Sequence, residues 1–210
     1  MTLQKEYVLE EKSELNKVNY ISAYEWLKLK KFRVLYPERL VCSIYLDNYK
    51  MQSYYDTAEG ICPRRKIRIR TYNNQIFEDS INKYTLETKL TSDFERFKKQ
   101  QPIMDIENSL LHGIIDNQYG LCKPIIKISY SREYFILKKW RVTIDKNIKY
   151  SNFHDGSDFV YDDFFVLEIK TSIDEDTDEL RNFFNFPRSR FSKYQRGIEA
   201  LKIMKNNLKK

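Results

Sequence analysis

Residues 64–72 have the sequence Arg-Arg-Lys-Ile-Arg-Ile-Arg-Thr-Tyr, in which charged and apolar side chains alternate from Lys66 onward. Successive side chains of a β-strand point to opposite faces, so the alternation predicts a strand with one cationic face. That face carries Lys66, Arg68, Arg70 and Tyr72. Neighbouring cations on it lie about 7 Å apart and repel by about 0.6 kcal/mol in water, or by about 2.4 kcal/mol at an effective dielectric constant of about 20. On a solvent-exposed face this row of cations indicates no particular function. Inside a cavity, the repulsion between the cations requires a bound polyanion to offset it.

The composition of the chain favours an anionic partner. Of its 210 residues 32 % are charged, and the net charge is +7. Part of this excess is local, because residues 188–210 contain eight Lys and Arg but one Glu. The acidic run at residues 174–179 is interpreted as a solvated loop. Gly and Pro are scarce, with five of each, so we expect no long flexible linker and predict a single domain over residues 1–210.

The cysteine and histidine residues exclude several kinds of site. Three cysteines, at positions 42, 62 and 122, cannot form a closed disulfide framework, and no two have metal-ligand spacing. His112 and His154 stand alone, so neither a zinc site nor a catalytic triad is indicated. The first residues lack the apolar core of a signal peptide, and no apolar run approaches the length of a membrane span. We therefore expect a cytoplasmic protein.

Local patterns predict the order of the elements. Three helices are expected to begin at capping boxes of the type Ser-x-x-Glu/Gln, at residues 22–25, 92–95 and 192–195, and Pro102 is expected to end the second. The last of these helices carries an apolar stripe of Ile198, Leu201, Met204 and Leu208. Residues 48–60 are predicted as a loop with a helical turn, and residues near 105–117 as a partly buried helix. Strands are predicted at 5–10, 40–46, 64–72, 83–89, 124–135, 140–145 and 164–170.

At least four of these strands, far apart in the sequence, present ionic residues on one face and apolar residues on the other. An ordinary antiparallel sheet with one face in water accounts for such a pattern. A closed barrel with a charged lumen and an apolar exterior covered by helices explains the predominance of cations better. Both arrangements remain open from the pattern alone.

Six short motifs occur in an order that resembles the VTC (vacuolar transporter chaperone) domain, the polyphosphate-polymerase branch of the triphosphate tunnel metalloenzymes and a relative of CYTH proteins. They are residues 66–72 (Lys-Ile-Arg-Ile-Arg-Thr-Tyr), 86–89 (Leu-Glu-Thr-Lys), 130–135 (Tyr-Ser-Arg-Glu-Tyr-Phe), 141–145 (Arg-Val-Thr-Ile-Asp), 166–170 (Val-Leu-Glu-Ile-Lys) and 191–194 (Phe-Ser-Lys-Tyr). The resemblance implies an α+β fold built on a closed eight-stranded antiparallel β-barrel, the triphosphate tunnel, with flanking helices and a C-terminal helix. It also implies transfer of the γ-phosphate of ATP to a growing polyphosphate chain, with Mn²⁺ or Mg²⁺ as cofactor.

The resemblance also assigns roles to residues. Arg68, Arg70 and Lys193 are implied as catalytic residues. The implied phosphate-binding residues are Lys66, Lys89, Arg132, Arg141, Lys170 and Arg190, and the implied metal ligands are Glu168 and Glu87. These residue types suit the chemistry, because phosphoryl transfer depends on positioning the phosphates and neutralising their charge.

Simpler roles remain open for several of these residues. Glu168 and Lys170 also fit an ion pair without metal, and Glu87 fits a partner of Lys89. Asp145 is expected to orient Arg141 or close a turn. Lys193 also fits a surface lysine in the first turn of a helix.

One departure from the family pattern concerns the first strand. Triphosphatase relatives carry a Glu-x-Glu-x-Lys signature there, whereas residues 3–7 are Leu-Gln-Lys-Glu-Tyr. This argues against the first alternative function, hydrolysis of tripolyphosphate or a nucleoside triphosphate. A noncatalytic polyphosphate- or nucleotide-binding module is a second alternative.

Binding of single-stranded nucleic acid ranks lowest, because within the basic motif Tyr72 is the only aromatic residue on the cationic face. The expected partners are ATP and polyphosphate, with no specific nucleic acid. Having no span of its own, the chain is expected to make or bind polyphosphate without translocating it. A membrane-associated partner protein remains open.

Overall fold

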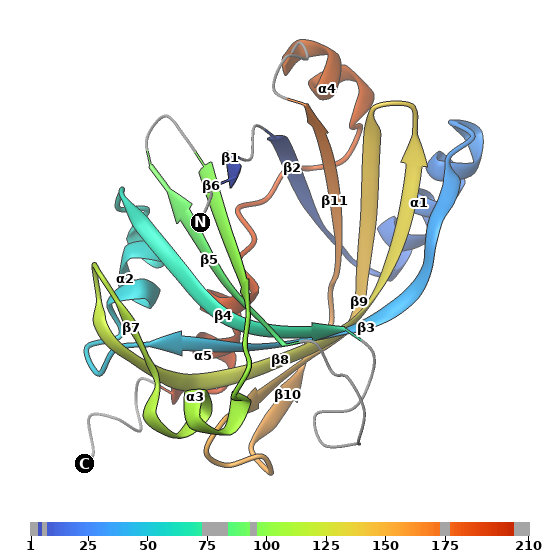
Figure 1. Cartoon of the computed structure of the whole chain (residues 1–210). Coiled ribbons are helices and arrows are strands. Elements are labelled where there is room, and N and C mark those ends of the chain that lie inside the picture. The colour runs from blue at the N-terminus through green and yellow to red at the C-terminus, as the bar shows by residue number, and fades with distance from the viewer. Residues whose placement is uncertain (1–3, 6–7, 73–83, 93–95, 173–176, 204–210) are drawn as a thin grey trace.

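The computed structural model describes residues 4–5, 8–72, 84–92, 96–172 and 177–203. All ladders between the described strands are antiparallel, and the sheet curls around a central space (Figure 1). The strands are β1 Gln4–Lys5, β2 Val8–Leu15, β3 Arg33–Asp47, β4 Arg64–Tyr72, β5 Thr85–Thr91, β6 Arg96–Pro102, β7 Ile114–Asp116, β8 Gly120–Leu137, β9 Trp140–Asn152, β10 Phe159–Tyr161 and β11 Phe165–Ser172. The helices are α1 Lys17–Leu29, α2 Gln52–Glu59, α3 Ile106–His112, α4 Thr177–Phe183 and α5 Lys193–Ala200.

The N-terminal segment contributes to both edges of the curled sheet. The strand order is β1-β6-β5-β4-β3-β8-β9-β11-β2, with β7 and β10 paired off this path. β1 pairs with β6 through Lys5 and Phe97, whereas β2 pairs with β11 along its whole length. Residues 6–7 alone separate β1 from β2 in the sequence. Counted as one divided strand, the pair gives eight strands along the curled sheet in the described chain, which confirms the predicted tunnel-like fold.

The apolar faces of the strands point outward and are covered by helices. Ala23 and Leu27 of α1 and Leu180 of α4 pack with Val142 of β9 and Leu167 of β11. A second cluster joins α5 to β3, β8 and β9, and a third joins α3 to β4 and β5. Successive side chains of a strand point to opposite faces of the sheet. Since the apolar side chains pack outward against the helices, the side chains between them point into the space inside the sheet. The predicted apolar exterior is therefore present.

Helix α5 is fixed so that its first residue lies at the tunnel. Ser192 caps the helix by accepting the backbone N–H of Gln195, as its capping box predicts. The Tyr194 hydroxyl donates to Asp47 Oδ2 at 2.6 Å, and Asp47 also accepts backbone N–H groups at the start of α2. At Gly197 a Cβ atom would lie 2.7 Å from the ring of Tyr150, so only glycine permits this approach. These contacts tie α5 to strands β3 and β9.

Two predicted helices are wrong or displaced. The first helix begins at Lys17, because Asn16 accepts the N–H of Asn19 and caps it. Ser22 lies inside that helix, where its hydroxyl bonds the carbonyl oxygen of Val18. The segment before Pro102 is strand β6, which pairs with β5 along its whole length. The sheet thus overrides the local helix signal, most of which (93–95) lies outside the described residues.

Smaller differences concern the lengths of elements. The strands β3, β8 and β9 extend well beyond their predicted ranges because their outer parts pair with one another. Residues 105–117 form the short helix α3 followed by strand β7 instead of one helix. Two members of the predicted apolar stripe of the last helix, Met204 and Leu208, lie outside the described residues. Among the described helices, none is both long and apolar enough to cross a membrane.

Candidate functional site

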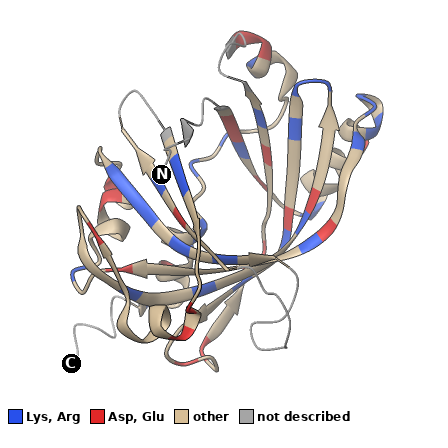
Figure 2. Ribbon diagram, in the orientation of Figure 1, with Lys and Arg blue, Asp and Glu red and all other residues tan. Residues whose placement is uncertain are grey.

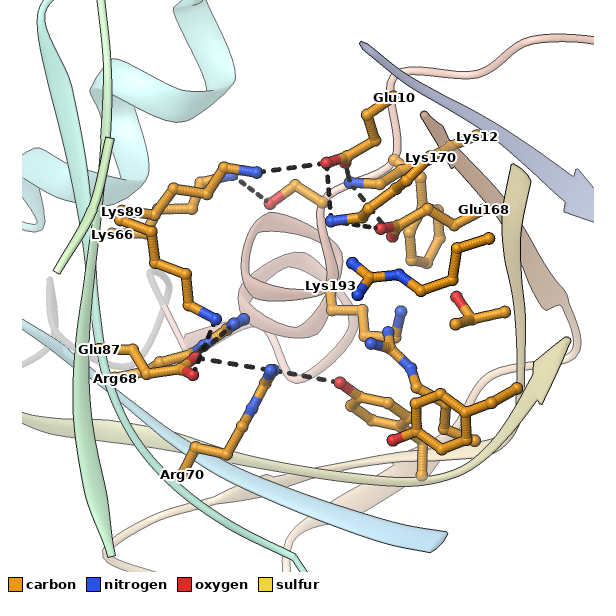
Figure 3. A pocket seen from close by; sticks show the side chains of 18 of the residues that line it. Glu10, Lys12, Lys66, Arg68, Arg70, Glu87, Lys89, Glu168, Lys170 and Lys193 are labelled. Atoms are coloured by element: carbon orange, nitrogen blue, oxygen red, sulfur yellow. Dashed lines mark hydrogen bonds and ion pairs between the residues drawn. The ribbon is translucent and has the colours of Figure 1, made fainter. Parts of the chain in front are cut away.

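Charged side chains from seven strands and from the start of α5 meet in one cavity of about 280 Å³ inside the curled sheet (Figure 3). Figure 2 shows where Lys, Arg, Asp and Glu lie along the described strands. The described lining of the cavity includes ten Lys and Arg side chains and three Glu side chains. The cations are Lys12, Lys66, Arg68, Arg70, Lys89, Lys98, Arg132, Arg141, Lys170 and Lys193, and the carboxylates are Glu10, Glu87 and Glu168. They come from β2, β4, β5, β6, β8, β9 and β11 and from the start of α5. The row of cations on β4 therefore faces a cavity and not open solvent.

The structure brings together all but one of the predicted site residues. Arg190 is the exception, because it is exposed and does not line the cavity. Sequence analysis missed Glu10, Lys12 and Lys98. The first two were missed because the first strand was placed too early, and the signature was sought at residues 3–7. Lys98 was hidden by the erroneous helix. In correct register, the first strand does present a Glu-x-Lys pair to the lumen.

On one wall, Glu87 of β5 holds three cations, and we call Glu87, Arg68, Arg70 and Lys98 the Glu87 cluster. Arg68 Nη2 lies 2.6 Å from the carboxylate, Lys98 Nζ 3.1 Å and Arg70 Nη1 3.5 Å. Burial raises the pKa of Glu87, but the three cations outweigh it and hold this pKa well below its usual value. The carboxylate therefore stays charged and orients the two guanidinium groups.

Tyrosine hydroxyls complete the placement of these guanidinium groups. Arg68 donates to the hydroxyl of Tyr45 at 3.0 Å, and Arg70 donates to Tyr130 at 3.1 Å and to Ser43 at 3.0 Å. Burial raises the pKa of Tyr45, yet Arg68 and Arg70 reverse the shift and lower it. A buried phenol with a lowered pKa reports a strongly positive potential in this part of the cavity.

On the facing wall, two carboxylates share two lysines, and we call Glu10, Glu168, Lys12 and Lys170 the Glu10–Glu168 cluster (Figure 3). Lys170 Nζ lies 3.1 Å from Glu10 and 2.8 Å from Glu168. Lys12 Nζ lies 2.6 Å from Glu10 and 3.9 Å from Glu168. Burial and the neighbouring Glu10 raise the pKa of Glu168, but the two lysines and Arg132 lower it overall. Both carboxylates are thus held charged and close together.

A third ion-paired group lies between the two walls. Asp145 is fully buried and accepts two hydrogen bonds from Arg132, at 2.5 and 2.7 Å. The same carboxylate accepts one from Lys193 Nζ at 2.5 Å. Burial raises the pKa of Asp145, whereas Arg132 and Lys193 lower it well below its usual value. Asp145 thus orients Arg132 and Lys193, and not Arg141 as the sequence suggested.

The comparisons with known proteins agree with this geometry. The sequence model of the VTC domain matches residues 3–119 and 107–202. The chain belongs to the VTC-domain family. Among solved structures, a putative adenylate cyclase from Bacillus halodurans is similar with a TM-score of 0.53 at 12 % identity, covering 97 % of this chain and 92 % of that one. An RNA triphosphatase of S. pombe gives 0.36 at 11 % identity, over 98 % and 84 %. No curated protein sequence matches the chain.

The family match shows a VTC domain, and the similarity to the solved structure from Bacillus halodurans shows the fold alone. The arrangement of charge in the cavity suits an anion that carries several phosphates. Guanidinium groups bind phosphate oxygens bidentately, and ammonium groups add point charges. An excess of cations in a confined space costs repulsion energy, which a polyanion relieves.

The VTC domain also contains donors suited to a divalent cation. The Glu10–Glu168 cluster supplies two adjacent carboxylates, the hard oxygen ligands that Mg²⁺ and Mn²⁺ prefer. No group of three or more His, Cys, Asp or Glu able to hold a metal is found in the described part of the chain. The remaining ligands would therefore be substrate phosphates and water. Glu87 lies on the facing wall with its oxygens already engaged, so the structure separates the two predicted metal ligands.

Lys66 is a tunnel cation without a carboxylate partner among the described residues. Its Nζ donates to Ser192 Oγ at 3.0 Å. Burial and the positive charges of Lys12, Lys89, Arg64 and Arg68 lower its pKa to about 7. The VTC domain thus holds a lysine that gains its charge readily when an anion enters the tunnel.

Proposed function

We propose that this VTC domain transfers the γ-phosphoryl group of ATP to the end of a polyphosphate chain, with Mn²⁺ or Mg²⁺ as cofactor. The observation that carries the proposal is the convergence of ten cations from distant segments on one cavity that also holds an adjacent pair of carboxylates. The reaction forms a bond from a terminal polyphosphate oxygen to the γ-phosphorus and breaks the bond to ADP. The attacking oxygen is already anionic, so this transfer needs no general base.

The residues would divide the work by position. Arg68 and Arg70 neutralise the transferred phosphoryl group, since the Glu87 carboxylate and two phenols hold their guanidinium groups in place. Lys193 meets the same group from the start of α5, released from Asp145 when phosphate replaces that carboxylate. Lys66, Lys89, Arg132, Arg141 and Lys170 bind the remaining phosphates. Glu168 together with Glu10 holds the metal, which supplies further neutralisation of phosphate charge. Arg190 has no part in this scheme.

Hydrolysis of a triphosphate is the second candidate, and one observation favours it. Glu10 and Lys12 face the lumen from the first strand, so the missing signature is partly restored. The paired glutamate of the full signature is still absent, because Val8 stands two residues before Glu10. The polymerase therefore remains our preferred function.

One assay separates the candidates. The purified protein is incubated with ATP and Mn²⁺, with Mg²⁺ in a parallel reaction, and the products are resolved on a gel stained for polyphosphate. Long chains support the polymerase. Release of free phosphate alone supports the hydrolase. Tight binding of polyphosphate without turnover of ATP supports the noncatalytic module and overturns the proposal.

The same assay tests the assignment of Arg68. In Arg68→Ala we expect the rate of polyphosphate synthesis to fall by about a hundredfold or more, because one preorganised contact to developing charge is lost. Arg181→Ala is a matched control, since Arg181 is exposed on α4 outside the cavity. Thermal unfolding shows whether each variant retains its fold. Full activity in a folded Arg68→Ala protein would refute the role.

A further inference from the structure

Three tyrosines lie on the rim of the cavity, beyond the arginines that face its interior. Tyr36 of β3, Tyr72 of β4 and Tyr134 of β8 all line it. Tyr36 is 46 % exposed and Tyr72 41 %, whereas Arg70 is 5 % exposed. Tyr72 follows Arg70 by two residues, and Tyr134 follows Arg132 by two, so each ring lies about 7 Å further along its strand. The cavity is therefore cationic inside and aromatic at this opening.

Two of these rings form one group with a guanidinium. Tyr36 and Tyr134 are direct partners across the β3–β8 ladder, with ring centroids 5.7 Å apart at 82°. Arg39 lies 4.9 Å from the centre of the Tyr36 ring and 5.8 Å from that of Tyr134. The ladder register shifts on both sides of Tyr36, and such irregularities re-aim side chains. The result is a partly open surface of ring faces and edges beside the cavity.

The ring faces of this surface suit a planar ring and not a phosphate, whereas the guanidinium of Arg39 suits either. The face of a phenol ring carries negative potential, so it repels an anion. A nucleobase, in contrast, stacks on tyrosine rings and on guanidinium planes. In a nucleoside triphosphate a ribose separates the base from the phosphates, which matches rings placed one step outside Arg70 and Arg132. An inorganic polyphosphate would leave the faces of the three rings unused.

We propose that Tyr36, Tyr134 and Tyr72, with Arg39, bind the base of a nucleoside triphosphate whose phosphates extend inward to Arg70 and Arg132. This inference rests on the proposed function insofar as that function requires a nucleotide donor. It adds the residues that distinguish a nucleotide from inorganic tripolyphosphate. Stacking depends weakly on which base is bound, so ATP and GTP are expected to bind with affinities within a few-fold of each other.

The test compares two ligands that differ in the nucleoside. Affinities of ATP and inorganic tripolyphosphate are measured by titration calorimetry for the wild type, the double variant Tyr36→Leu/Tyr134→Leu and the conservative variant Tyr134→Phe. We expect the double variant to lose ATP affinity by about fivefold or more, with tripolyphosphate affinity changed by less than about twofold. Tyr134→Phe retains the ring and should bind ATP as the wild type does. Tyr49→Leu is the control, because Tyr49 is a highly exposed tyrosine that does not line the cavity.

The outcomes separate this inference from the proposed function. Equal losses for both ligands, or no loss for either, would overturn the base-binding site. A selective loss for ATP in a protein that makes no polyphosphate would keep the site and reject the polymerase. Should the double variant fail to fold, the triphosphate of 2-aminopurine riboside gives a direct signal in the wild type. Stacking is supported if binding quenches the fluorescence of the analogue, if excess ATP reverses the quenching, and if tripolyphosphate reverses it only at saturation. Unchanged fluorescence of the bound analogue would overturn the base-binding site.

Discussion

The two facing walls of the tunnel use carboxylates in opposite ways. In the Glu87 cluster one carboxylate serves three cations, whereas in the Glu10–Glu168 cluster two carboxylates share two lysines. The first wall therefore keeps a surplus of positive charge, and the second is balanced. Lys89 of the first wall reaches Glu10 of the second at 3.5 Å, so the clusters lie within range of each other (Figure 3).

This difference assigns distinct ligands to the two walls. A surplus of fixed cations attracts phosphate oxygens, and a divalent cation would be repelled there. On the balanced wall a divalent cation gains two carboxylates and displaces the ammonium groups of Lys12 and Lys170 from them. A glutamate in a strand of this tunnel is thus either an anchor for arginines or a metal ligand, depending on how many cations already surround it.

The largest expected effect concerns the stability supplied by Glu87. The pKa of Glu87 is lowered in the folded protein from its ordinary value of 4.5, so the charged carboxylate stabilises the fold above that pH. This stability is lost progressively as the pH falls below 4.5. Glu87→Gln leaves three cations without their partner and should lower the free energy of unfolding at pH 7 by about 3 kcal/mol. Urea unfolding at pH 7 and pH 3 measures this difference, which should shrink at the lower pH. A constant difference would contradict the assignment.

A smaller effect is expected on the metal dependence of activity. In Glu168→Gln the metal concentration that gives half-maximal activity should rise by about tenfold or more, because a charged oxygen ligand is lost. Glu87→Gln should leave that concentration unchanged even where it lowers the maximal rate. Titration of both variants with Mn²⁺ at saturating substrate provides the comparison. Equal shifts in the two variants would show that the walls do not differ in metal binding.

The smallest effect concerns Lys66, which is repelled by cations of both walls, Lys12 and Arg68 among them. Its pKa is lowered to about 7, and a bound polyanion would raise it again. Tripolyphosphate affinity should therefore be greatest below pH 7 and fall by about fivefold as the pH rises to 9. In Lys66→Arg the side chain stays charged up to pH 9, so tripolyphosphate affinity should not fall over this range. The protonation of tripolyphosphate itself changes equally in the experiments with the wild type and with the variant. Calorimetry measures the affinity of both proteins across the pH range. Parallel curves of affinity against pH would show that Lys66 does not cause the decline.

The site residues predicted from sequence are those whose placement follows from the two-residue period of a strand. Lys66, Arg68 and Arg70 share a face for that reason, and so do Glu168 and Lys170. The capping box before α5 likewise placed Lys193, because its signal is local and nothing competes with it. The eight-stranded tunnel came from the order of six motifs and not from any single pattern.

Other features depend on contacts between distant segments. Glu10 meets Glu168 only because β2 pairs with β11 in one register, in which Lys12 lies opposite Glu168. The register of β2 was not evident, since its charged residues Glu10, Glu11 and Lys12 do not alternate with apolar ones. Strand β6 was obscured by a helix-capping pattern that pairing with β5 overrides. The placement of Tyr36 depends on irregularities in β3 next to Pro37, and their effect on the pairing with β8 does not follow from the local sequence.

The division of the first strand into β1 and β2 predicts how the protein behaves when its N-terminus is shortened. β1 covers part of β6 with backbone hydrogen bonds, and two residues later the same segment continues as β2 on the opposite edge. Trimming the chain to Val8 would uncover the edge of β6 at Phe97 and Lys98. Uncovered strands recruit other strands, so the shortened protein would tend to self-associate through this edge, an outcome that light scattering would reveal.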